Sequence, residues 1–122
     1  MVHRKGVPAM PKVFGIHTIA LKPGVKAEDF ERFVIEEVYP VSELEGVEMY
    51  VLKGDRGDRE GKYLWVMEIE SVEARDRLFP SPGESSEEAR QFFESYAAVL
   101  EKWETFATPV DVIYTDYVVV GK

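Results

Sequence analysis

The segment of residues 13–24 reads VFGIHTIALKPG, an apolar, β-branched run that a Pro-Gly turn closes. This composition predicts a β-strand over residues 13–21. Because side chains alternate along a strand, His17 shares one face with Ile19, whereas Ile16 lies on the other. Both faces are mainly apolar, which is typical of a strand in the middle of a sheet covered on both sides. We therefore predict a central strand with His17 at its middle.

The residues that follow this strand predict three helices and three further strands. Apolar residues at helical spacing and alternating apolar runs give these ranges: helices at 27–39, 72–79 and 86–106, and strands at 47–53, 62–70 and 112–120. Pro40 is expected to end the first helix, and Ser71 to cap the second. Ser85, followed by Glu88, forms a capping-box pattern for the long third helix, and Pro109 separates that helix from the last strand.

The order of the main elements is strand, helix, strand, strand, helix, strand. This is the split β-α-β arrangement of the ferredoxin-like plait, an α+β fold with a four-stranded antiparallel sheet. Its first and third strands are central, and its two long helices cover one face. We expect a single domain over 13–122, preceded by a flexible N-terminal arm over 1–12.

The strands predict a homodimer, because they carry apolar side chains on both faces while the helices form only one layer. In the strand at 62–70, Leu64 and Val66 form one apolar set, and Trp65, Met67 and Ile69 form the other. A monomer would expose a broader apolar patch than soluble monomers usually tolerate. Covering about 500 Å² per subunit is worth on the order of 12 kcal/mol before association costs. Sheet-to-sheet pairing of two copies would provide this cover.

Composition narrows the classes of partner. The chain has 122 residues and a formal net charge of −8, which disfavours nucleic acid and anionic membranes as partners. It has no cysteine, and no apolar run approaches the length of a membrane span, so we expect a cytoplasmic protein with neither disulfides nor a membrane partner. It also lacks asparagine and has one glutamine, Gln91, a thermophile-like bias.

Three short segments resemble one superfamily. They are LKPG at residues 21–24, EIESVEA at 68–74 and TDY at 115–117. With the predicted topology, they are similar to the dimeric α+β barrel superfamily, which includes antibiotic-biosynthesis and haem-degrading monooxygenases, polyketide cyclases, and stress-responsive and NIPSNAP-like barrel proteins. The resemblance implies that the bare faces of two sheets meet as a barrel and that each subunit holds a pocket, either between its sheet and its helices or within the barrel.

The sequence departs from the catalytic patterns of these relatives. Haem-degrading members use a histidine after the third strand, and this chain has none there. Where cyclases place a tyrosine and a histidine, the chain offers Leu78, Ser81 and Glu84. Quinone-forming oxygenases favour a tryptophan where Ile69 stands, and Trp65 lies four residues earlier on the same face. The resemblance therefore implies an architecture without an intact catalytic motif.

His17 and Asp116 are the candidate catalytic residues. Histidine titrates near neutral pH and can act as a general base. Matching the strands by topology places Asp116 on the neighbouring strand, where a carboxylate could hold the imidazole in one tautomer. An interior Asp116 would need a compensating partner, because an isolated buried carboxylate is costly. The alternative is a hydrogen-bonded pair in the core or at the dimer interface.

A second set of residues is expected to bind a flat aromatic or polyketide-like molecule. Its members are Trp65, Met67, Tyr114, Tyr50, Ile19 and Phe33. Aromatic side chains at a dimer seam are also ordinary packing, and both interpretations stay open. One histidine among scattered carboxylates has no metal-ligand spacing, so we expect neither a metal site nor a cofactor.

Three functions fit these residues. The first is a cofactor-independent enzyme of the monooxygenase or cyclase type, with His17 as general base. The second is a ligand-binding or stress-related barrel protein without catalysis. The third is haem binding through His17.

Overall fold

A computed structural model describes residues 11–109 and 115–121 of the chain. The strands are β1 (Val13–Leu21), β2 (Val47–Lys53), β3 (Tyr63–Ile69), β4 (Ala107–Pro109) and β5 (Thr115–Val118). The helices are α1 (Ala27–Phe33), α2 (Val72–Leu78), α3 (Glu87–Ser95) and α4 (Ala97–Phe106), with a π-helical segment (Val34–Val38) and a 3₁₀ turn (Tyr39–Val41) after α1.

The strands form one antiparallel sheet in the order β2-β3-β1-β4, and β5 pairs with the other half of the same edge of β1. The central position predicted for 13–21 is therefore confirmed. On β1, Gly15 lies opposite Met67 of β3 and Asp116 of β5, and His17 lies opposite Trp65. The α+β class and the antiparallel sheet are confirmed, and they are compatible with a ferredoxin-like fold.

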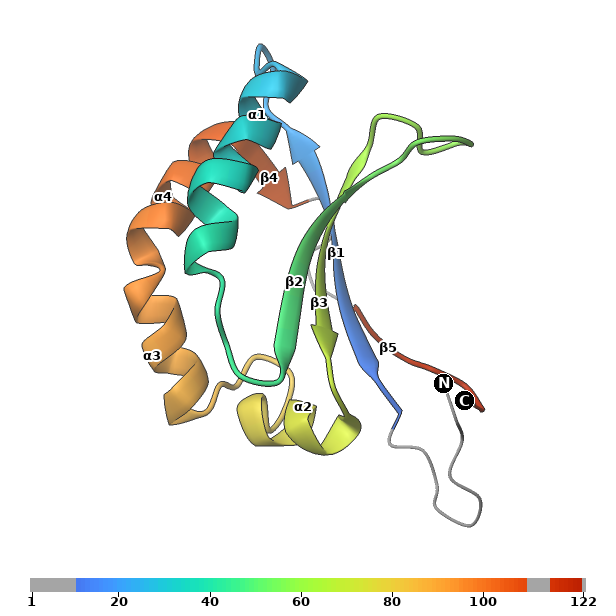
Figure 1. Cartoon of the computed structure of the whole chain (residues 1–122), viewed down its shortest axis with the longest axis vertical. Helices are drawn as coiled ribbons and strands as arrows, with labels where there is room; N and C mark the ends of the chain where they lie inside the picture. The colour runs from blue at the N-terminus through green and yellow to red at the C-terminus, as the bar shows by residue number, and fades with distance from the viewer. Residues whose placement is uncertain (1–10, 110–114, 122) are drawn as a thin grey trace.

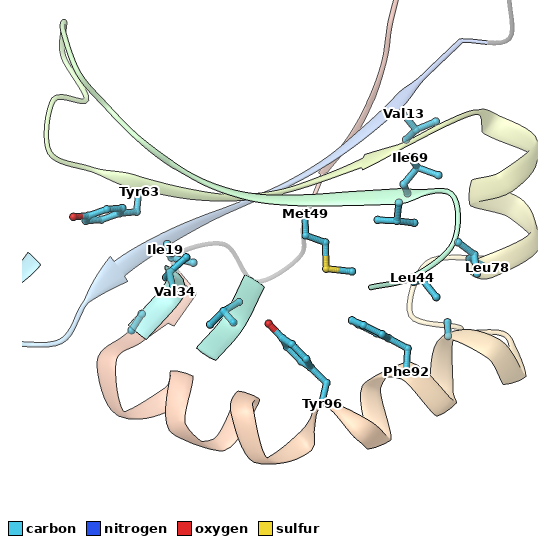
Figure 2. Close-up of a cluster of buried hydrophobic side chains, with 14 of the residues drawn as sticks. Val13, Ile19, Val34, Leu44, Met49, Tyr63, Ile69, Leu78, Phe92 and Tyr96 are labelled. Atoms are coloured by element: carbon cyan, nitrogen blue, oxygen red, sulfur yellow. The ribbon is translucent and has the colours of Figure 1, made fainter. Parts of the chain in front are cut away.

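The helices α1, α3 and α4 cover one face of the sheet, and no described element covers the other (Figure 1). We call the uncovered side the bare face. The core lies between the sheet and the helices (Figure 2), and its largest fully buried side chains are Phe30, Leu78, Val13 and Val38. Helical spacing in α1 and alternation in β1 bring Phe30 and Val13 to the same layer.

The prediction of one long helix over 86–106 is wrong, because the chain bends at Tyr96 and forms two helices, α3 and α4. The amide of Tyr96 is shared between the carbonyls of Phe92 at 3.0 Å and Phe93 at 3.2 Å. The apolar spacing runs through the bend without interruption, so the local pattern does not reveal it. The N-cap is also one residue later than predicted, since the hydroxyl of Ser86 accepts from the amide of Ala89 at 3.1 Å.

Two prolines behave differently from their predicted roles. Pro40 lies inside the 3₁₀ turn that follows the π-helical segment, where its missing amide hydrogen costs little. Pro109 pairs with Ile19 as the last residue of β4, so the chain enters the sheet before this proline. Of the strand predicted over 112–120, the structure has β5 over Thr115–Val118; the prediction extends two residues too far at its end, and 110–114 lie outside the described residues.

The arm predicted over 1–12 also lies largely outside the described residues. In the described part of the arm, the ammonium of Lys12 binds the carboxylate of Glu68 in β3 at 2.7 Å. The backbone carbonyl of Lys12 accepts from the amide of Val119 at 3.2 Å. Among the described helices, none has the length and hydrophobicity that crossing a membrane requires.

Candidate functional site

A partly open cavity of about 400 Å³ lies between the helix-covered face of the sheet and the helices α3 and α4. The loop from α2 to α3 closes one side of it. Met49 of β2 points across this space toward Phe92 and Tyr96 (Figure 2). The core is therefore hollow at this place instead of close-packed.

Alternate residues of the central strands form the sheet wall of the cavity. They are Gly15, His17 and Ile19 of β1, and Trp65, Met67 and Ile69 of β3. The antiparallel register sets His17 directly beside Trp65, and Gly15 beside Met67. Gly15 lines the cavity without a side chain, so it takes up no space there.

The bent helix forms the opposite wall. Its lining residues are Phe92, Phe93 and Tyr96 from α3 and the bend, and Leu100 and Trp103 from α4. Trp103 meets Trp65 edge to face, with ring centroids 5.5 Å apart, and Phe92 stacks on Tyr96 at 5.3 Å. The contact between Trp65 and Trp103 joins the two walls, and together these rings surround the cavity.

Tyr96 contributes an uncharged phenol hydroxyl to this wall. Its side chain is almost fully buried, and its hydroxyl lies 3.3 Å from that of Ser42, which donates to the carbonyl of Val38 at 2.6 Å. Burial raises the pKa of Tyr96, while the contact with Ser42 lowers it less. The phenol therefore stays protonated at neutral pH and can orient a ligand but not act as a base.

Asp116 has the compensating partner that an interior carboxylate requires. Its Oδ2 accepts from the guanidinium of Arg75 on α2 at 2.7 Å, and both side chains are largely shielded from solvent. Arg75 also donates to Asp76 at 2.8 Å. Hydrogen bonds to Asp76 and then Asp116 raise the pKa of Arg75, so the guanidinium keeps its charge. This ion pair ties α2 to β5 beside the cavity.

The structure brings together five of the eight residues predicted for the site. His17, Asp116, Trp65, Met67 and Ile19 all line the cavity. The Asp116 carboxylate is bound by Arg75, and the orienting role predicted for Asp116 toward His17 stays a prediction.

The other three predicted residues do not line it. Phe33 is buried in the core and stacks on Phe106 with centroids 4.8 Å apart. Tyr50 points to the bare face, because Met49 and Val51 on either side of it face the helices. Tyr114 lies outside the described residues.

Several lining residues were not predicted as part of a site. They are Met49, Phe79, Glu84, Tyr96, Leu100 and Trp103. Three of them, Tyr96, Leu100 and Trp103, belong to the apolar stripe of 86–106, which sequence reasoning assigns to a packed core. The one feature of the sequence that could have indicated a cavity is the large number of aromatic residues on a helix stripe that faces one small sheet.

Within the part of the chain that the structure describes, no group of three or more histidine, aspartate or glutamate side chains could hold a metal ion. Compared with known protein families, curated proteins and solved structures, the chain gives no match.

Proposed function

We propose that the protein binds a hydrophobic, aromatic small molecule in the cavity between its sheet and α3–α4. The cavity itself carries this proposal, because its volume of about 400 Å³ falls within the usual range for ligand pockets. An engineered apolar cavity of about 150 Å³ already holds benzene, so this one has room for two or three fused rings. Its walls of aromatic and methionine side chains suit a flat apolar body.

His17 is the group that would perform chemistry on such a molecule. It lies in the sheet wall of the cavity beside Trp65, where a bound molecule comes within the hydrogen-bond reach that a general base requires. The resemblance to dimeric α+β barrel enzymes that need no cofactor favours proton transfer by His17 as the catalytic step. The alternative is binding without turnover, and the two differ only in what happens to the bound molecule.

The first test is native mass spectrometry of the purified protein, followed by extraction and identification of any co-purified molecule. We expect an aromatic or similarly flat apolar compound. Leu100→Trp should fill the cavity and displace it, whereas Glu101→Trp, one residue along on the exposed side of α4, should retain it. Equal retention by both variants would place the ligand elsewhere and contradict the proposal.

The second test concerns His17. His17→Ala should abolish conversion of the bound compound while leaving the protein folded and able to bind it. Full conversion by His17→Ala would remove His17 from the mechanism, and binding by the wild type without conversion would favour the non-catalytic alternative. A Soret band on haem titration that is lost in His17→Ala would favour haem binding instead.

The proposal includes a homodimer in which two sheets meet through their bare faces, as in the barrels that the chain resembles. Tyr50, Leu52 and Tyr117 point to this face and are 37%, 47% and 55% exposed. Apolar patches rimmed by polar residues mark interaction surfaces. The cavity lies on the opposite side of the sheet, so dimerisation and ligand binding use separate surfaces.

A further inference from the structure

We propose that the cavity selects an organic cation, an aromatic body that carries a protonated amine at the end nearest α2. The inference rests on the proposed function, since it names the class of molecule that the same cavity takes.

The cavity has a polar end and an apolar end. Asp116 lies beside α2, because Arg75 of that helix binds it, and Glu84 follows α2 in the loop that leads to α3. Ile19 lies four residues along β1 from the partner of Asp116, about 13 Å away at the rise of a strand. The edge-to-face pair of Trp65 and Trp103 closes the apolar part. A bound molecule therefore meets carboxylates at one end and rings along its length.

The polar end carries negative charge. Among the described residues that line the cavity, two are carboxylates and none is lysine or arginine. Arg75, whose guanidinium binds Asp116, also donates to Asp76 and is therefore shared between two carboxylates. Glu84 is an exposed side chain at the mouth of the cavity that accepts from the hydroxyl of Ser81, and among the described residues it has no ion pair. The bond from Arg75 uses Oδ2 of Asp116, and no described side chain is bonded to Oδ1, which can accept from a ligand.

The N-terminus of α3 does not reverse this charge. Ser85 lines the cavity next to this end of the helix, and a helix N-terminus favours anions. However, the hydroxyl of Ser86 already accepts from the amide of Ala89, and the first turn carries Glu87 and Glu88. The Ser86 hydroxyl already binds a free amide of the first turn, and the two glutamates offset the positive end of the helix dipole. An anionic ligand would therefore gain little there.

The rings of the cavity add a second attraction for a cation. The faces of tryptophan, tyrosine and phenylalanine are electron-rich and attract ammonium groups. The lining holds six such residues, which are Trp65, Phe79, Phe92, Phe93, Tyr96 and Trp103. The net charge of −8 also raises the local concentration of cations around the molecule. Both effects act in the same direction as the two carboxylates.

The experiment compares three probes that share one ring system and differ in charge. Binding of 2-naphthylmethylamine, 2-naphthalenemethanol and 2-naphthoate is measured by calorimetry at pH 7. We expect the amine to bind at least about tenfold more tightly than the naphthoate, with the alcohol between them. Equal or tighter binding of the alcohol or the naphthoate would overturn the cation preference and leave the proposed apolar site intact. Failure of all three probes to bind would count against both proposals.

Variants connect the preference to the two carboxylates. Glu84→Gln combined with Asp116→Asn should reduce the preference for the amine to about threefold or less, while binding of the alcohol is kept. The control, Glu60→Gln combined with Glu101→Gln, removes the same charge from exposed positions outside the cavity and should keep the full preference. If the Asp116 substitution impairs folding, Glu84→Gln alone should still lower the preference measurably. An unchanged preference in a folded Glu84→Gln and Asp116→Asn variant would refute the assignment.

Discussion

At the scale of single residues, Glu31 joins a helix to the edge of the sheet. Its Oε2 accepts from the ammonium of Lys53 at 2.8 Å and from the hydroxyl of Tyr63. Hydrogen bonds from Lys53 and then Tyr63 lower the pKa of Glu31, and burial raises the pKa of Tyr63. The charged form of Glu31 is therefore the one that stabilises the fold.

This contact predicts a pH-dependent effect of Glu31→Gln. Because the pKa of Glu31 is lower in the folded chain than its ordinary 4.5, its stabilisation is complete above that value and is lost as pH falls through the lowered pKa. Urea unfolding should show a loss of under about 1 kcal/mol at pH 7, since the side chain is partly exposed, and a smaller loss near pH 3. Glu36→Gln, at an exposed position, should change little at either pH. A loss of equal size at both pH values would contradict the role of the charge.

At the scale of elements, the bend at Tyr96 turns a core stripe into a cavity wall. It separates α3 from α4, so that Phe92 and Trp103 meet different parts of the sheet wall. A straight helix crosses a twisted sheet over a limited length, whereas a bent one follows the sheet farther. The half-buried aromatic residues of α3 and α4 are the consequence, because they face a hollow instead of a packed layer.

Substitutions at the start of α3 test which serine caps the helix, Ser86 as in the structure or Ser85 as the sequence pattern predicts. Ser86→Ala should lower the free energy of unfolding by about 1 kcal/mol, because it removes the hydroxyl that accepts from the amide of Ala89. Ser85→Ala should change it by less than about 0.5 kcal/mol. Chemical denaturation of the two variants side by side measures the difference. A larger loss for Ser85→Ala would restore the capping box that the sequence favours.

At the scale of the whole molecule, helices cover one face of the sheet and leave the other bare, which predicts that two chains associate. Leu52 lies on the bare face and is 47% exposed, and Ile35, on the helical side, is 64% exposed. We expect a homodimer in sedimentation velocity at micromolar concentration. Leu52→Lys should shift it toward single chains by burying an unpaired charge in the interface, whereas Ile35→Lys should leave it unchanged.

Two results would count against this association. Wild-type protein that sediments with the mass of one chain would remove the dimer. Dissociation by Ile35→Lys, with no effect of Leu52→Lys, would move the interface to the helical side.

The sequence by itself determined the strands at 13–21 and 47–53, the central place of β1, and the face of that strand on which His17 and Ile19 lie. These features follow from alternation and turn residues, which are properties of neighbouring positions. Only the tertiary structure decided that the helix bends at Tyr96, that Tyr50 faces away from the cavity, and that Arg75 compensates Asp116 from 41 positions away. Each of these depends on contacts between segments far apart in the chain, and a local pattern carries no record of which distant side chain will arrive.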